Sequence, residues 1–345
     1  MRLFRAVFAF IVLAIAAYVF FTVGFREQNN ANDLVLQLPS GSKPPETHRE
    51  KGKPLKLTFV GDIMLDRYIR QVGEHRGYDY ILDKITTMLK ESDVVAGNLE
   101  GPITTQNSLS IHTVEGDKNH QAFTFSPETL KMLYENNIRI VSVGNNHILD
   151  FGISGLKETR SFLKKYNIEY FGDPREENQN VLMKEINGKK IGFISFNQFA
   201  RQDVEQLLSE IKNTASQAGF TVVFAHWGEE YEKTPDKIQL ALGRSFIDAG
   251  ADLVIGTHPH VIQSKEIYNS KWIYYSLGNF VFDQYFGEDV RCGAVISFVL
   301  PVEDNRYVVE EKFVYLANDG ATVKSDCASE VPTLQTLEKN NLLPR

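Results

Sequence analysis

Two histidines separated by one proline, His258 and His260, are the residues whose spacing most directly indicates chemistry. They follow a short apolar run at residues 253–255 and a glycine, Gly256, a pattern typical of a loop that leaves a buried strand. Two imidazoles on such a loop can reach one or two metal ions lying over the end of the strand. A His-Pro-His tripeptide also occurs on ordinary surface loops, so a metal site requires ligands from elsewhere in the chain.

Further candidate ligands follow other predicted strands at a similar distance. Apolar runs typical of strands occur at residues 55–60, 93–96, 138–143 and 220–225. The metal-capable residues just beyond them are Asp62, Glu100, Asn146, His147 and His226. Because ligands of layered α/β folds gather at the carboxyl ends of strands, we expect these side chains to converge with the two histidines. Each has an ordinary explanation as a capping or hydrogen-bonded residue, but together they favour a metal centre.

Oxygen and imidazole ligands suit a divalent metal such as Mn, Fe, Zn or Mg, bound as one ion or as a bridged pair. Two bridged ions about 3.5–4 Å apart would activate a water molecule and stabilise an oxyanion. We expect Glu100 to bridge, Asp62 and His260 to hold one ion, and Asn146, His226 and His258 to hold the other. His147 is then left to protonate a leaving group, with Asp150 orienting its ring.

The elements that must position these residues predict an α/β fold that is not a simple parallel sheet. Helices are expected at residues 80–90, 127–136, 154–166, 203–218 and 236–249. Asn187-Gly188 between two apolar runs predicts a β-hairpin, and antiparallel pairs are expected at residues 264–275 and 293–316. A polar insertion at residues 101–122, which carries His112 and His120, is expected to cover the site.

The N-terminal residues predict a membrane anchor. Arg2 and Arg5 precede an apolar run at residues 6–25, which is long enough to span a bilayer and leaves the N-terminus in the cytoplasm. The alternative is a cleaved signal peptide. We expect a stub at residues 1–5, a single span at 6–25, a flexible linker at 26–54, an extracytoplasmic domain at 55–316 and a polar tail at 317–345. The protein is therefore expected at the cell membrane as a single-pass protein.

Composition limits the partners of the protein. The 345-residue chain has 43% hydrophobic and 23% charged residues, as expected for a folded globular protein. Its net charge of -7 argues against a nucleic-acid partner, because no basic excess is present to neutralise phosphates. The cysteines, Cys292 and Cys327, are too few for a disulfide scaffold, and we expect two unpaired thiols. One bridge in an oxidising compartment is the alternative.

Six segments of the sequence resemble, in order, the CapA family of capsule-synthesis proteins linked to poly-γ-glutamate. They are GDIMLDR, GNLEGPIT, VGNNHILDFG, AHWGEEY, GTHPHVIQ and YSLGNFVFDQ, and they span about residues 55–300. The family is similar to the calcineurin-like metallophosphatases, and this resemblance implies a four-layer α/β/β/α sandwich. Two departures affect the site. Met64 occupies a position where that superfamily has a metal-binding histidine, and Glu100 replaces a bridging aspartate.

The resemblance implies a membrane-anchored, extracytoplasmic protein of capsule or poly-γ-glutamate biosynthesis or export. We expect a metal-dependent hydrolase that uses a metal-activated water on a phosphoester or a polymer-linked bond. Its substrate would be an anionic polymer or a phosphorylated or lipid-linked molecule. The alternative is a non-catalytic accessory that binds nascent polymer or supports a membrane synthetase complex. Met64 favours the accessory, whereas His147 and the His-Pro-His loop favour the hydrolase.

Overall fold

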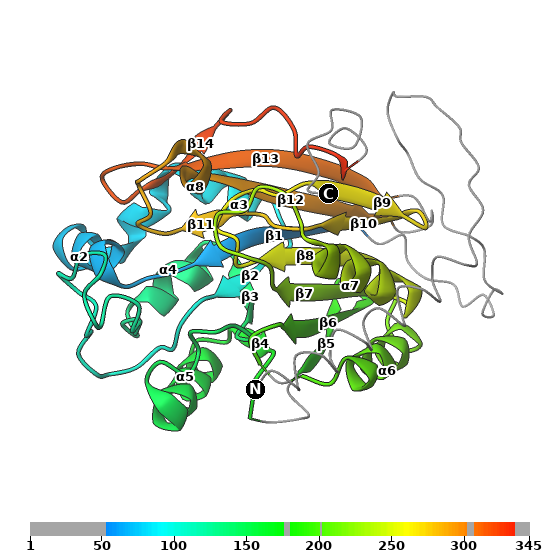
Figure 1. Ribbon diagram of the computed structural model, residues 1–345, viewed down its shortest axis with the longest axis horizontal. Coiled ribbons are helices and arrows are strands. Elements are labelled where there is room, and N and C mark those ends of the chain that lie inside the picture. Colours follow the sequence, from blue (N-terminus) through cyan, green and yellow to red (C-terminus); the bar gives the residue numbers. More distant parts are fainter. Residues whose placement is uncertain (1–52, 176–179, 201, 302–306, 335–345) are drawn as a thin grey trace. The chain divides into compact units, whose positions relative to one another are not determined.

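The computed structural model describes residues 53–175, 180–200, 202–301 and 307–334, which are built around two β-sheets (Figure 1). The larger sheet has eight strands in the order β14-β13-β12-β1-β2-β3-β4, with β11 paired to β1. Their bounds are β1 (Leu55–Ile63), β2 (Val94–Leu99), β3 (Ile138–Ser142), β4 (Glu169–Phe171), β11 (Asn279–Val281), β12 (Cys292–Leu300), β13 (Val308–Leu316) and β14 (Thr322–Ser325). β1 is central, parallel to β2 and β11 and antiparallel to β12.

The smaller sheet has six strands in the order β5-β6-β7-β8-β10-β9. Their bounds are β5 (Val181–Ile186), β6 (Lys189–Asn197), β7 (Phe220–His226), β8 (Leu253–Thr257), β9 (Lys265–Tyr268) and β10 (Lys271–Tyr274). The four inner strands are parallel, and each edge strand is antiparallel to its neighbour. In Figure 1 the arrows of β1, β7 and β8 point to the same side, so the loops that follow these strands leave on one side.

Three apolar cores separate four layers. The helical elements are α2 (Arg67–Arg76), η1 (Tyr78–Ile81), η2 (Asp83–Ile85), α3 (Thr86–Lys90), α4 (Thr129–Glu135), α5 (Gly152–Lys165), α6 (Val204–Ala215), α7 (Lys237–Asp248) and α8 (Glu288–Arg291). One core lies between the larger sheet and the helices α2, α3, α4 and α5. A second core lies between the two sheets, and a third lies between the smaller sheet and the helices α6 and α7. This is the four-layer α/β/β/α sandwich that the sequence resemblance implied.

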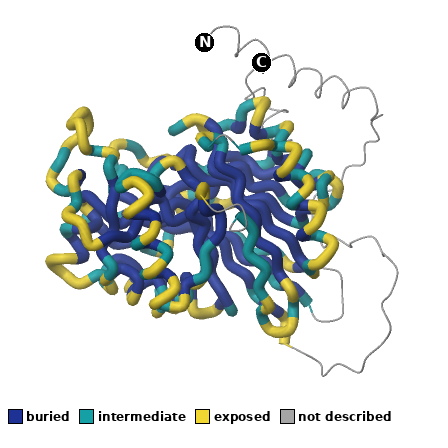
Figure 2. Tube along the Cα trace, turned by 90° about the horizontal axis from the view of Figure 1, so that it is seen from below, coloured by how far each residue is buried: buried dark blue, intermediate teal, exposed yellow. Residues whose placement is uncertain are grey.

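The inner strands are buried on both faces, which explains their continuous apolar runs. Along β1, Leu57 and Phe59 pack in the core between the sheets, whereas Val60 and Ile63 pack with the helices. Figure 2 shows the strands as buried tubes and the exposed residues mainly in loops and helices. The site at the strand ends is therefore supported by cores on both sides of each sheet.

Several predicted elements are confirmed, one predicted helix is wrong, and one helix was not predicted. The hairpin at Asn187 and Gly188 forms between β5 and β6, with both residues at positive φ as a tight hairpin turn requires. The single helix expected at residues 80–90 is instead η1, η2 and α3, because the backbone leaves the helical region at Leu82 and Ile85, whose side chains enter the core. Helix α2 was not predicted, since its buried face includes Arg67 along with few apolar residues.

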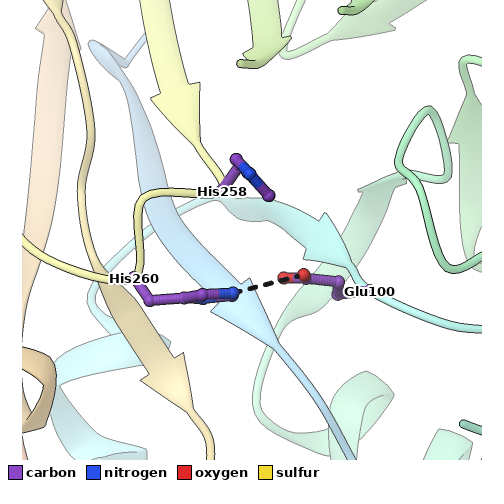
Figure 3. A group of neighbouring side chains, drawn as sticks. All are labelled: Glu100, His258 and His260. Atoms are coloured by element: carbon purple, nitrogen blue, oxygen red, sulfur yellow. Dashed lines mark ion pairs between the residues drawn. The ribbon is translucent and has the colours of Figure 1, made fainter. Parts of the chain in front are cut away.

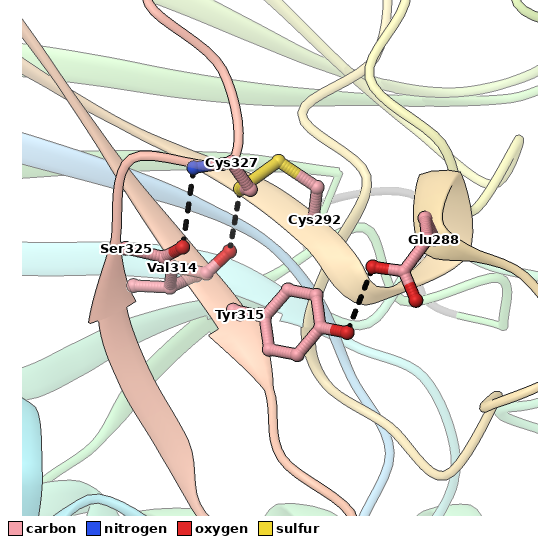
Figure 4. The surroundings of a disulfide bond; sticks show 6 residues. All are labelled: Glu288, Cys292, Val314, Tyr315, Ser325 and Cys327. Atoms are coloured by element: carbon pink, nitrogen blue, oxygen red, sulfur yellow. Dashed lines mark hydrogen bonds between the residues drawn. A yellow bond between two sulfur atoms is a disulfide. The ribbon is translucent and has the colours of Figure 1, made fainter.

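The expectation of unpaired thiols is also wrong, and so is that of a polar tail for residues 317–334, the part of the expected tail that the structure describes. β14 adds to the larger sheet beside β13, and Val331 beyond it is fully buried. The return of the chain along β13 brings Cys327 to Cys292 at the start of β12, where the two form a disulfide with a Cα–Cα distance of 6.0 Å (Figure 4). The pairing could not be inferred from a tail that appeared polar, because it depends on this extra strand.

The predicted membrane span at residues 6–25 and the linker up to residue 52 lie outside the described residues. Within the described part of the chain, no helix combines the length and apolar character needed to cross a bilayer.

Candidate metal centre

The two carboxylates of the site come from neighbouring strands of the larger sheet. Asp62 lies near the end of β1, opposite Asn279 of β11, and Glu100 directly follows β2. Neither carboxylate residue has any exposed surface. A Cβ atom at Gly61 would lie 1.8 Å from the Gly278 carbonyl oxygen, so a glycine is required for β11 to approach β1. The glycine before Asp62 therefore allows β11 to lie beside the site.

The three histidines of the site come from the smaller sheet. His226 is the last residue of β7, and His258 and His260 lie in the loop after β8. The rings of His226 and His258 lie 4.8 Å apart, and those of His258 and His260 lie 5.8 Å apart. His258 and His260 have positive φ angles of 95° and 59°, a conformation that costs roughly 1–3 kcal/mol at non-glycine residues. Such strain is concentrated at functional sites.

The carboxylates and imidazoles converge into two overlapping groups, each with ligand atoms within 4.8 Å of one another. One group contains Glu100, His258 and His260, and the other contains Asp62, Glu100 and His226. Figure 3 shows the side chains of Glu100 and His260 directed toward each other, with His258 beside them, and Glu100 Oε1 lies 3.6 Å from His260 Nε2. Glu100 belongs to both groups, as a carboxylate that bridges two ions must.

Two buried atoms of this cluster indicate that it suits a cation. Glu100 Oε1 and His258 Nδ1 have no hydrogen-bond partner among the described residues. Leaving a buried polar atom unpaired costs about 1–3 kcal/mol, so native structures rarely contain one without a reason. A divalent metal would satisfy both atoms, and carboxylate with imidazole is a donor set typical of Mn, Fe or Zn. The residues present therefore fit the metal that the sequence predicted.

Burial sets the protonation of these groups. Desolvation, with the nearby Asp62 charge, raises the pKa of Glu100 well above its usual value. Desolvation raises the pKa of Asp62 too, but hydrogen bonds and the charge of His260 outweigh it, so its pKa is lowered. Burial lowers the pKa of His226 and brings that of His258 to about 4. Both imidazoles are therefore neutral near pH 7, as metal ligation requires.

The loop after β3 supplies the predicted Asn146, His147 and Asp150. Asn146 is exposed, and its Oδ1 lies 2.9 Å from His226 Nε2. His147 Nδ1 lies 2.9 Å from Asp150 Oδ2, and the His147 ring packs 4.4 Å from the Phe123 ring. Asp150 Oδ2 also accepts the Phe123 backbone N–H at 2.9 Å, which fixes the carboxylate. The structure thus brings all the predicted residues to one site, and their roles as ligands and proton donor stay predictions.

Sequence reasoning missed Asn98, a buried residue at the middle of the site. Its Nδ2 lies 2.8 Å from Asp62 Oδ1, 3.4 Å from Glu100 Oε2 and 3.3 Å from His226 Nδ1. Its Oδ1 accepts a hydrogen bond from Asn145 at 3.0 Å. Asn98 therefore connects both carboxylates with a histidine of the other sheet. The signal was present in the sequence, since Asn98 follows a glycine near a strand end, as Asp62 does.

Asn279 is the second asparagine that the sequence interpretation left without a role. Its Oδ1 lies 3.0 Å from His260 Nδ1, and its Nδ2 donates to the backbone oxygen of Val290 at 2.9 Å. Because this contact places the imidazole proton on Nδ1, Nε2 of His260 is left as the ligand atom facing Glu100. Asn279 thus orients His260 from outside the cluster.

A buried ion pair lies on the side of the site nearest α2, and loops outside the metal cluster contact it. Arg67 pairs with Asp283, and its guanidinium lies over the rings of Phe123 and Phe282. Arg67 Nη1 lies 3.0 Å from Nε2 of His120, so the insertion at residues 101–122 contacts this pair. Met64 lies in the helix-side core and its sulfur accepts the Asp66 N–H, which explains why it offers no ligand to the site.

The sequence matches known proteins over most of its length. Residues 56–284 match a family described as bacterial capsule synthesis protein PGA_cap. The PGA biosynthesis protein CapA of Bacillus subtilis is 31% identical over 318 residues, which cover 87% of this chain and 82% of that protein. The capsule biosynthesis protein CapA of Bacillus anthracis is 34% identical over 260 residues, which cover 70% of this chain and 62% of that protein. The fold is also similar to that of a phosphatase structure from Mycoplasma pneumoniae, with a sequence identity of 14% and a TM-score of 0.46. The superposition covers 85% of this chain and 100% of the phosphatase chain.

Proposed function

The chain belongs to the bacterial capsule synthesis family PGA_cap, and we propose that it acts in capsule or poly-γ-glutamate biosynthesis as a metal-dependent hydrolase. One observation carries this proposal. Two buried carboxylates and three buried imidazoles converge from both sheets, and two of their ligand atoms, Glu100 Oε1 and His258 Nδ1, have no hydrogen-bond partner among the described residues. A cluster that only stabilised the fold would be expected to pair these atoms.

The residues that would hold divalent metal are Asp62, Glu100, Asn146, His226, His258 and His260. When bound, the metal would supply Lewis-acid activation of water and of the substrate oxygen. Asn98 holds one oxygen of each carboxylate, and Asn279 holds the far nitrogen of His260. These contacts fix the donor atoms before substrate arrives, which reduces the reorganisation that the reaction needs.

His147 is the proposed proton donor to the leaving group. Asp150 holds Nδ1 of His147, so Nε2 is the ring atom that would transfer the proton. The His147 side chain is 12% exposed, which gives the ring access to solvent while Phe123 fixes its plane. We propose a phosphoester or a polymer-linked bond as the target, in an anionic polymer or a phosphorylated or lipid-linked substrate. The acidic net charge of the chain makes the metal the main attraction for such an anion.

We further propose that the domain is extracytoplasmic and anchored by residues 6–25, near a membrane synthetase complex. Arg2 and Arg5 before the apolar run favour a cytoplasmic N-terminus. The Cys292–Cys327 disulfide supports this topology, because disulfides persist in oxidising compartments and are rare in the cytosol.

The test uses the full chain purified in detergent, with and without a Glu100→Gln substitution. Metal content is measured by mass spectrometry, and hydrolysis is assayed with a generic phosphoester and with poly-γ-glutamate. We expect near-stoichiometric metal and hydrolysis in the parent, and loss of both in the variant. His75→Ala, at an exposed position on α2, is the matched control and should change neither.

Two results would alter the assignment. If the parent chain takes up no metal from any of the four candidate ions, the hydrolase proposal fails. Bound metal without hydrolysis of either substrate favours the accessory function, in which the site binds polymer without turnover. A His147→Ala variant that keeps its metal should lose turnover, and unchanged turnover would remove His147 from the mechanism.

A further inference from the structure

The candidate ligand atoms of the two overlapping groups differ in whether they are already hydrogen-bonded. In the group of Glu100, His258 and His260, Glu100 Oε1 and His258 Nδ1 have no hydrogen-bond partner among the described residues. Nε2 of His260 faces Glu100 Oε1 at 3.6 Å, since Asn279 occupies the other nitrogen of the ring. Each residue of this group therefore presents one ligand atom toward the same point.

The other group, Asp62, Glu100 and His226, is engaged in hydrogen bonds. His226 Nε2 lies 2.9 Å from Asn146 Oδ1, and its Nδ1 lies 3.1 Å from the Thr257 hydroxyl. Asp62 Oδ1 accepts from Asn98 at 2.8 Å, and Asp62 Oδ2 accepts the backbone N–H of His258 at 3.1 Å. An ion at this position would have to displace part of this network.

We propose that the centre is asymmetric, with one tight metal position formed by Glu100, His258 and His260 and a second, weaker position formed by Asp62, Glu100 and His226. This inference rests on the proposed metal-binding function. It assigns both histidines of the His-Pro-His loop to one ion, whereas the sequence spacing led us to divide them between two. Only the second position requires hydrogen bonds to be broken before an ion can bind.

The loop after β8 is held in place for the tight position. His258 and His260 have positive φ angles, and backbone contacts hold this conformation from both sides. The N–H of His258 donates to Asp62, and the carbonyl oxygen of Pro259 accepts the N–H of Tyr231 at 2.8 Å. Because these contacts already fix the loop, binding at the tight position needs little rearrangement.

The test is a calorimetric titration of the metal-stripped full chain in detergent with Mn²⁺. We expect two binding steps whose dissociation constants differ by on the order of tenfold or more, since tenfold corresponds to about one or two hydrogen bonds. His258→Ala and His260→Ala should each remove the tight step. His226→Ala should remove the weak step and leave the tight dissociation constant within about threefold, because His226 is not a member of the Glu100, His258 and His260 group.

Asn146→Ala provides a second variant in case the buried His226→Ala variant does not fold. Asn146 is exposed, so its replacement should leave the fold intact. Because Asn146 is a proposed ligand beside His226, Asn146→Ala should weaken or remove the weak step alone. His75→Ala is the control and should leave both steps unchanged. Unfolding curves of each variant show whether the chain is folded before it is titrated.

Two results would overturn the asymmetry, and a third would instead reject the proposed function. Two ions that bind with one affinity would contradict it. Loss of the same step in His226→Ala or Asn146→Ala as in His258→Ala, with His260→Ala affecting the other step, would restore the division predicted from the sequence. No heat and no bound metal in the parent chain would mean that the metal-binding function itself fails.

Discussion

The core between the two sheets and the candidate metal centre are built by the same strands. On β1, Phe59 lies in the core and Asp62 lies in the centre, and on β7 the same relation holds for Phe224 and His226. Phe59 packs against Phe224 at 6.0 Å between ring centres, and both residues are almost fully buried. Asp62 and His226 are equally buried, yet they are charged or polar.

The two regions are therefore buried to the same extent, but burial stabilises the fold in the core and destabilises it in the metal-free centre. Burying an aromatic ring stabilises the fold by removing apolar surface from water. Burying Glu100 beside Asp62 destabilises the apo fold, because the charged form is removed from water near a like charge. The fold remains stable because burial of the surrounding apolar core offsets this unfavourable free energy. Substitutions in the two regions should consequently separate stability from metal binding.

The largest expected effect is that of Phe59→Ala in the core. Removing a fully buried phenylalanine side chain should lower the free energy of unfolding by about 3–5 kcal/mol. Chemical denaturation measures the loss, and metal content is compared under conditions where the variant is still folded. We expect the metal stoichiometry of the folded variant to be unchanged. A folded variant that has lost its metal would show that the two regions are not separable.

Breaking the disulfide should resemble the core substitution on a smaller scale. Replacing both Cys292 and Cys327 by alanine should cost about 2–4 kcal/mol, since the bridge closes a loop between residues 35 positions apart. The bridge lies at the β12–β14 edge and contributes no ligand. Metal affinity should therefore be the same in the oxidised parent and in the double variant, and a fall in the affinity of the variant would link this edge to the centre.

In the absence of metal, Glu100→Gln should raise the free energy of unfolding, whereas the two preceding substitutions lower it. The pKa of Glu100 is raised in the fold, so its contribution to stability is complete below its unfolded pKa and is lost as pH rises through the folded pKa. Gln cannot ionise, and the metal-free variant should be more stable than the parent at neutral pH by about 1–3 kcal/mol. Thermal unfolding in chelator measures this gain, while added metal should raise the unfolding temperature of the parent alone. A metal-free variant less stable than the parent would refute the reasoning.

The smallest effect should follow from Asn279→Ala, which lies at the border between the two regions. Loss of its contact with His260 Nδ1 frees the ring to rotate or change tautomer, and metal affinity should fall by about 10–100-fold. Asn279→Asp keeps an acceptor and should retain most of the affinity. The nitrogen chemical shifts of His260 report the tautomer directly. If both variants bind metal as the parent does, Asn279 has no positioning role.

The positions of the ligands could be predicted from sequence because a short apolar run followed by glycine and a polar residue marks the end of a buried strand. That pattern located Asp62 and Glu100 without any knowledge of the packing, and His226 was found because it directly follows such an apolar run. It did not locate Asn98 or Asn279, because asparagine after glycine is common at turns, and only Asn146, beside His147, was expected to be a ligand. The same pattern applied to asparagine would have found both.

Other features depend on three-dimensional context that local patterns lack. The buried face of α2 includes Arg67, whose charge is matched by Asp283 more than 200 residues away, so no apolar period marked the helix. The disulfide required β14, a four-residue strand with little signal of its own. The grouping of His258 with His260 depends on a loop in which both residues have positive φ angles, and the spacing of two histidines does not predict such a loop.

The central place of β1 has a consequence for how the protein is made. Its neighbours include β12, so the first strand of the domain pairs with a strand that begins at residue 292. Such long sequence separation slows folding, and a ribosome must complete nearly the whole domain before this pairing can form. Until then one edge of β1 presents unpaired backbone groups, the kind of surface that promotes aggregation. Chains ended before residue 292 are therefore expected to be insoluble even though they contain every proposed metal ligand.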